Sequence, residues 1–204
     1  AELIANLTFP EPGKKLMERK IKINSMTKKI VKLLKIKPDD EKAVQYKNKI
    51  LDAHQSLAHD FIKFDNAAEA AQVISSGLNV SPENEALISI KNALETPERT
   101  LKDSEKIKIG QLLELAEQRF SDAKFTSPKN QSSLDAYREI LIINPHSSKA
   151  QLGVRQILSI YEEKIDSLIN TDLPAANDTL NEALELFPFS QSLIQLQNKI
   201  KSRI

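Results

Sequence analysis

The chain of 204 residues has no cysteine, only 4 glycines, and only 5% aromatic residues. The absence of cysteine excludes disulfide bonds, thiol catalysis and any metal site that needs a cysteine ligand. The scarcity of glycine and aromatic residues disfavours turn-rich β-sandwiches, β-barrels and glycine-rich phosphate loops, and it favours long helices. The 29 basic and 28 acidic residues give a formal net charge of +1, so the overall charge does not favour binding to nucleic acid or membrane.

Long hydrophobic runs are missing as well. No stretch approaches the roughly 18 apolar residues that a membrane span needs, and the N-terminus has no basic segment followed by an apolar one, as a signal peptide would. Because the chain begins with Ala1 rather than Met, we expect it to be a segment of a longer protein. The sequence therefore leaves the compartment, cytoplasmic or periplasmic, open.

A repeat organises most of the sequence. Four similar stretches align around Pro38, Pro82, Pro145 and Pro188. Each proline is expected to end a helix, because it lacks an amide hydrogen and restricts the residue before it. The second interval is lengthened by a polar interruption at 95–104 and by an extended turn at 126–131. Acidic and hydroxyl residues near the prolines suit the first turn of the helix that follows: Asp39, Asp40, Ser81, Glu83, Ser147 and Ser190.

The apolar periodicity predicts helices throughout and strands nowhere. The predicted helices span 13–36, 39–64, 67–79, 83–95, 105–123, 132–143, 147–169, 173–186 and 189–202. Residues 1–12 are predicted to be an irregular lead-in, followed by a basic amphipathic helix at 13–38. The region 39–204 then divides into units at about 39–82, 83–145 and 146–188, with a terminal helix at 189–202.

Residues 51–82 resemble a tetratricopeptide repeat. Large, small, aromatic and proline residues fall at the positions that this family prefers: Leu57, Ala58, Phe61, Ala70, Ile74, Gly77 and Pro82. The last unit has Ala176, Leu180, Ala183, Leu184 and Pro188 in the same register, and the middle unit departs further. The stretch 112–145 also resembles divergent repeats of larger bacterial proteins, some joined to kinase or formylglycine-enzyme-like domains, which implies an accessory region.

The resemblance implies an all-α fold: a right-handed α-solenoid of antiparallel helix hairpins. Each hairpin must bury one face on its neighbour, because a single hairpin cannot bury its own apolar surface. The long helices 39–64 and 147–169 would then each belong to two units. The alternative is a helical bundle without repeats.

The resemblance also implies a protein-interaction or scaffolding role, with a peptide or a partner helix bound in the groove that the first helix of each unit lines. Because the lysine and asparagine set that clamps a terminal carboxylate in some relatives is missing, we expect a mixed or apolar ligand. Carried over residue by residue, the predicted groove residues are Gln55, His59, Ile62, Lys63, Leu113, Glu117, Phe120, Glu162 and Asp166.

The sequence offers no catalytic or metal-binding pattern. His54 and His59 are five residues apart, about 140° around a helix, which rules out the i, i+4 spacing for a shared metal ion. The acidic runs at 39–41 and 162–166 suit a helix start and a solvated face. No nucleophile motif, phosphate loop or dinucleotide fingerprint is present. We therefore expect no enzyme, no cofactor and no metal.

The segment 14–37 is strongly basic, with Glu18 its only acidic residue. An apolar stripe is predicted at Leu16, Ile23, Met26, Ile30 and Leu33. The segment suits an anionic membrane surface or an acidic partner, but we favour a stripe packed on the next helix with solvated lysines. Nucleic acid is disfavoured because aromatic residues are not interleaved. A structural spacer within a larger enzyme is a further alternative. The predicted basic patch is Lys14, Lys15, Arg19, Lys20, Lys22, Lys28, Lys29, Lys32 and Lys35.

Overall fold

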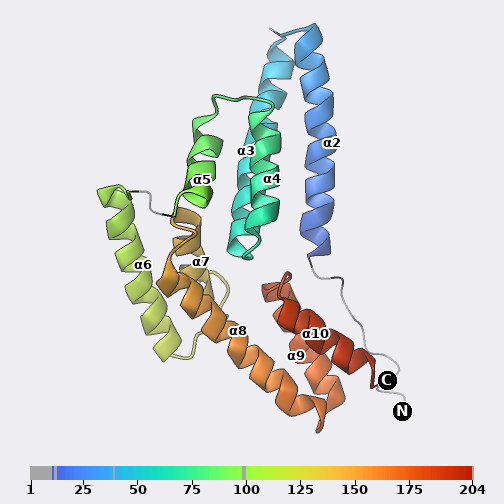
Figure 1. Cartoon of the computed structure of the whole chain (residues 1–204), viewed down its shortest axis with the longest axis vertical. Coiled ribbons are helices and arrows are strands. Elements are labelled where there is room, and N and C mark those ends of the chain that lie inside the picture. Colours follow the sequence, from blue (N-terminus) through green and yellow to red (C-terminus); the bar gives the residue numbers. More distant parts are fainter. Residues whose placement is uncertain (1–10, 12, 39, 98–99, 204) are drawn as a thin grey trace. The chain divides into compact units, whose positions relative to one another are not determined.

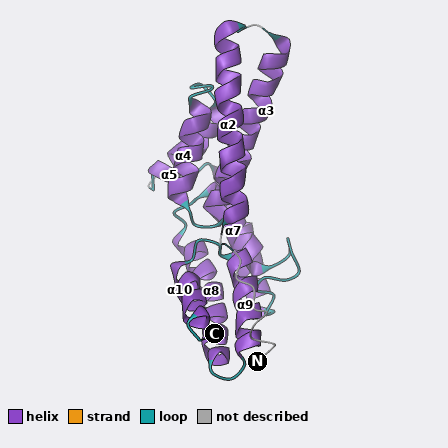
Figure 2. Ribbon diagram, turned by 90° about the vertical axis from the view of Figure 1, so that its right-hand side faces the viewer, coloured by secondary structure: helices purple, strands orange, loops and turns teal. Residues whose placement is uncertain are grey.

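The computed structural model describes residues 11, 13–38, 40–97 and 100–203. Within these residues the chain is all-helical, without strands, as the periodicity predicts (Figures 1 and 2). Apart from residue 11, the predicted lead-in at 1–12 lies outside the described residues, as does Asp39. The helices are α2 (Lys14–Ile36), α3 (Glu41–Lys63), α4 (Ala67–Leu78), α5 (Glu85–Glu95), α6 (Asp103–Ser121), α7 (Ser133–Ile143), α8 (Ser148–Ile169), α9 (Leu173–Leu186) and α10 (Gln191–Lys201).

Local side-chain caps set several helix starts. The Asp40 carboxylate accepts a hydrogen bond of 2.9 Å from the backbone amide of Ala43 at the start of α3, which satisfies one of the amides that a helix start leaves unpaired. After Pro82, α5 begins at Glu85, two residues later than predicted, and its cap is Asn84. Ser81 and Glu83, which were expected to suit its first turn, therefore precede the helix. Ser81 instead donates to the Glu83 carboxylate at 2.9 Å.

The described chain forms two compact units. The first unit comprises the described residues of 15–111 and 139–147, and the second comprises those of 1–14, 112–138 and 148–204. The boundary falls within α6 and α7, so the predicted middle repeat at 83–145 contributes to both units.

In the first unit, α4 packs against α3 and α5. A short turn at 64–66 joins α3 to α4, and Asp65 has a positive φ of 56° within it. The packing positions that the repeat pattern singles out in this hairpin are buried. A Cβ at Gly77 would lie 2.5 Å from Leu87 Cδ1 and 3.1 Å from His54 Cβ, so the small residue at 77 allows the close approach of α3, α4 and α5.

Helix α2 lies beside α3 and α4 in the first unit (Figure 1), and several of its polar side chains contact them. Arg19 donates to the Asp60 carboxylate at 2.5 Å and to Ser56 Oγ at 2.9 Å. Lys20 donates to the Glu69 carboxylate and, at 2.7 Å, to Gln72 Oε1. These two members of the predicted basic patch are therefore paired within the unit.

The predicted apolar stripe of α2 is partly wrong. Ile23 and Ile30 are buried, but Met26 is 43% exposed and Leu33 is 38% exposed. Thr27 is buried between the two isoleucines, because its hydroxyl donates to the Ile23 carbonyl at 2.9 Å and shares a 2.8 Å hydrogen bond with His54 Nε2 of α3. The buried side of α2 therefore follows a line through positions 16, 20, 23, 27, 30 and 34, which includes polar residues.

In the second unit, α8, α9 and α10 pack against one another. Their core contains Ile157, Ile165 and Leu180. Buried Arg138 of α7 donates to the Leu186 carbonyl at the end of α9 and lies over the Phe187 ring, 5.5 Å from its centroid. Burial lowers the pKa of Arg138 to about 10.

Candidate functional site

A hollow of about 400 Å³ lies in the first unit, between α3, α5, α6 and the end of α7. We call it the α3/α5/α6 hollow. Its apolar lining residues are Ala86, Ile90 and Ala93 of α5 together with Ile142 and Ile143 of α7. Its polar lining residues are Gln55, His59, Ser89, Ser104, Glu105 and Lys108. Apolar surface with a few converging polar groups is the usual composition of a binding site.

Two of the predicted groove residues, Gln55 and His59, line this hollow. They stand four residues apart on α3, so their side chains are neighbours on one face of the helix. The neighbouring residues Leu57, Ala58 and Phe61 are buried on other sides of α3. These side chains pack into the core, and those of Gln55 and His59 therefore line the hollow.

The charges around the hollow are nearly balanced. Burial lowers the pKa of His59, the nearby Lys63 lowers it further, and Asp60 opposes this shift. The imidazole is therefore neutral near pH 7, when it both donates and accepts hydrogen bonds. Glu105 and Lys108 have opposite charges and lie three residues apart on α6. The rim thus offers donors and acceptors without a strong charge of one sign.

Ile62, another predicted groove residue of α3, does not line this hollow. Its side chain is 5% exposed and belongs to the core at the end of α3. The face of α3 that lines the hollow at Gln55 and His59 is therefore buried one turn further along the helix. Lys63, the next residue, is half-buried and lies outside the hollow's lining.

The predicted groove residues of α6 do not line the hollow. Leu113, Glu117 and Phe120 lie in the part of α6 that belongs to the second unit. Leu113 and Phe120 are half-buried, and the Phe120 ring packs edge to face on Phe125 with 4.9 Å between their centroids. Glu117 is exposed; together with the larger effect of burial, it raises the pKa of Tyr137.

Glu162 and Asp166 line a separate hollow of about 300 Å³ in the second unit, between α8 and α10. Both carboxylates already have a partner on α10. Asp166 accepts from Lys199 at 2.7 Å, and Glu162 accepts from Ser192. These two predicted groove residues therefore connect helices, and reversing their charges would also break contacts between α8 and α10.

The remaining lining residues of the α3/α5/α6 hollow were missed by the sequence analysis. Ser89, Lys108 and Ile142 come from three different helices, and no spacing within the chain signals that they converge. A further hollow of about 450 Å³ lies between α4 and α5, beside Pro82 and Lys91. The α3/α5/α6 hollow is the stronger candidate, because it gathers more polar groups, among them a histidine with a shifted pKa.

Among the described residues, no group of three or more histidine, aspartate or glutamate side chains is placed to hold a metal ion. No helix in the described part of the chain is long and apolar enough to cross a membrane.

The tetratricopeptide resemblance depends on the residues quoted for it. Comparison with models of protein families, with curated proteins and with solved structures finds no match for this chain.

Proposed function

We propose that this chain is a non-catalytic protein-interaction module, built from divergent repeats of the tetratricopeptide type. Its α3/α5/α6 hollow would receive an apolar side chain of a peptide or of a partner helix. The observation that carries this proposal is that Gln55 and His59, which the family resemblance assigns to a ligand groove, line a hollow with an apolar floor.

The lining of the hollow defines the chemistry of the partner. Ile90, Ile142 and Ile143 offer apolar surface to one aliphatic or aromatic side chain. Gln55 and neutral His59 offer hydrogen bonds to the backbone or polar groups beside that side chain. Because Glu105 and Lys108 offset each other, a strongly acidic or basic partner gains little, and a mixed or apolar segment fits best. Helices that are already packed lower the cost of ordering the site.

Ser89→Arg tests this proposal. Ser89 is exposed on α5 and lines the hollow, so an arginine there fills the space without disturbing the core. Asn92→Arg is the matched control, because Asn92 is exposed on the same helix outside the lining. Peptides are selected from a phage-displayed library against the whole chain, and their dissociation constants are measured by fluorescence polarisation for the wild type and both variants.

We expect peptides with an aliphatic or aromatic anchor, at least tenfold weaker binding to Ser89→Arg, and unchanged binding to Asn92→Arg. A tenfold change corresponds to about 1.4 kcal/mol, less than the full burial of one such side chain supplies. Peptides that bind all three proteins equally, or a selection that yields no peptide sensitive to Ser89→Arg, would exclude the hollow as the binding site.

A further inference from the structure

The outward face of α2 carries lysines that form no ion pair with the other described residues. Lys14 pairs with Glu11 at 3.0 Å, and Arg19 and Lys20 pair with α3 and α4. The other lysines of this segment are exposed, and none has an ion pair or a side-chain hydrogen bond in the part of the chain that the structure describes. We call the lysines among them that lie within α2 the α2 basic face: Lys15, Lys22, Lys28, Lys29, Lys32 and Lys35.

Apolar side chains lie among these lysines. Ile21 is 68% exposed and Ile36 is 75% exposed, and Leu33 is exposed between Lys32 and Lys35. Isoleucines with so little burial contribute nothing to the core of the unit. Their position suits contact with a surface that carries negative charge and has an apolar interior within reach.

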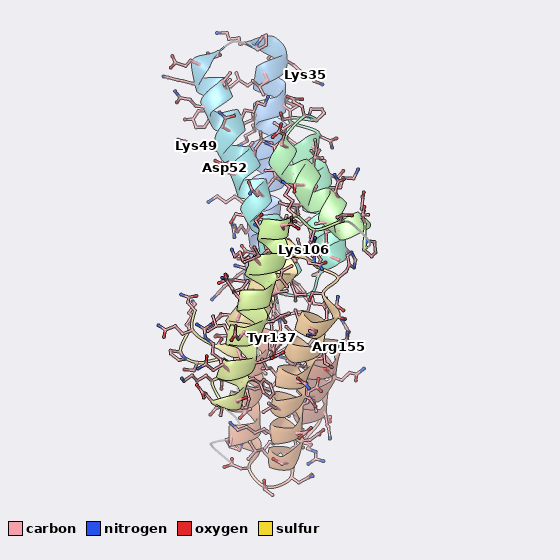
Figure 3. The ribbon with its side chains drawn as sticks, turned by 90° about the vertical axis from the view of Figure 1, so that its left-hand side faces the viewer. Lys35, Lys49, Asp52, Lys106, Tyr137 and Arg155 are labelled. Carbon is pink, nitrogen blue, oxygen red and sulfur yellow. The ribbon has the colours of Figure 1, made fainter. Side chains whose placement is uncertain are left out.

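The geometry of α2 separates a packing side from this basic face. The buried line through Ile23, Thr27 and Ile30 faces α3 and α4, and at 100° per residue the exposed isoleucines and most lysines fall on the other side. From Lys15 to Lys35 the basic face extends over about 30 Å of helix, at 1.5 Å per residue. Lys35 marks its C-terminal end in Figure 3, and beyond it Asp40 caps the start of the next helix, α3.

We propose that the α2 basic face docks on an anionic membrane surface, with α2 lying in the plane of the headgroups and Ile21, Leu33 and Ile36 entering the interface. This role goes beyond the peptide hollow and does not depend on it. The charge complementarity is with anionic lipid headgroups, because each lysine near such a surface gains attraction and apolar side chains gain a place to be buried. A nucleic acid fits less well, because α2 has no aromatic residue to stack on bases.

Vesicle cosedimentation of the whole chain tests the charge requirement. The probe is vesicles of phosphatidylcholine with about one-third phosphatidylserine, and vesicles of phosphatidylcholine alone are the reference. The test variant replaces Lys28, Lys29 and Lys32 by Gln, which has a similar helix propensity. The matched control replaces Lys129, Lys149 and Lys164, which are exposed elsewhere, by Gln, so both variants lose the same charge.

We expect binding to the anionic vesicles only, and weaker binding at high salt, because salt screens surface charges. Each lysine is worth about fivefold in partitioning near an anionic surface, so the α2 triple variant should bind about 100-fold more weakly. The control variant should lose much less. Equal loss in both variants would show that net charge, and not the α2 basic face, drives binding, and it would overturn the proposal, as would an absence of vesicle binding.

A single introduced tryptophan tests the apolar part, since the chain has none. The fluorescence of the Ile36→Trp variant should shift to the blue and be quenched by brominated lipid when anionic vesicles are added. Ile107→Trp, at a residue of α6 that is 63% exposed, should show neither change. If the lysine variant loses binding to vesicles and to heparin alike, and the Ile36→Trp variant shows no shift, the face is a site for an acidic macromolecule and the membrane proposal is wrong.

Discussion

Gly153 gives a sharp test of the packing in the second unit. A Cβ at this position of α8 would lie 2.6 Å from Tyr137 Cε1 and closer still to Cζ and Cε2. The Tyr137 ring is 5% exposed, so it has little room to move away. Gly153→Ala must therefore displace a buried ring or push α7 away from α8.

Two opposing effects set the change in the free energy of unfolding that Gly153→Ala causes. Alanine is about 1 kcal/mol better than glycine inside a helix, while an extra carbon in a packed core typically costs about 1–3 kcal/mol. Gly110 of α6 provides the control, because a Cβ there has nothing within 4 Å. Gly110→Ala should stabilise the chain by about 1 kcal/mol. The difference between the two variants, about 1–3 kcal/mol, isolates the cost of overpacking.

Urea denaturation followed by circular dichroism measures both free energies of unfolding, and thermal melts should separate the variants by roughly 2–4 °C per kcal/mol. In a Tyr137→Leu background the ring is gone, so the penalty of Gly153→Ala should shrink markedly. If Gly153→Ala were as stabilising as Gly110→Ala, or if the Tyr137→Leu background left its effect unchanged, the close contact between α7 and α8 would be refuted.

Two further stability predictions concern the first unit. Burial lowers the pKa of His54 despite the opposing Val73 carbonyl, so on acidification His54 is protonated in the unfolded state before it is protonated in the folded state. Neutral His54 therefore contributes fully to stability above about pH 6.5, and this contribution falls as the pH drops toward the folded-state pKa. His54→Gln should flatten this acid-side loss in urea midpoints, and a profile as steep as that of the wild type would contradict the burial argument. Lys20→Met leaves the Glu69 carboxylate, with a side chain 21% exposed, without its ion-pair partner, and should destabilise the chain by about 1–2 kcal/mol. Lys22→Met, at an exposed lysine, should change stability by less than about 0.5 kcal/mol; equal effects of the two lysine variants would show that the Lys20 pair contributes nothing.

The positions of the helices were predictable because their signals are local. Apolar periodicity, prolines between helices and capping side chains act within a few residues of the chain. Where helix starts were wrong, the error was also local. Asn84 caps α5, which starts two residues later than predicted. The amide of Lys102 bonds to the Glu105 carboxylate at 2.8 Å, which favours an earlier start of α6.

The buried side of α2 was harder to predict for a physical reason. Thr27 has a polar side chain that periodicity assigns to the surface, but His54 provides a hydrogen-bond partner 27 residues away and makes its burial favourable. Met26, beside it, is apolar and remains exposed. Hydrophobic patterning does not include such non-local partners. The predicted apolar stripe of α2 was therefore displaced around the helix from the side that is buried.

The sequence alone determined that this chain is helical, where its helices lie, and which residues of one hairpin are small enough for close packing. The family resemblance added the prediction that Gln55 and His59 line a ligand groove. Only the tertiary structure decided that Ile90, Lys108 and Ile142 join these two residues around one hollow, and that Asp166 is paired with Lys199. Helix formation depends on neighbours along the chain, whereas a binding surface depends on which distant segments are brought into contact, and no local pattern encodes that.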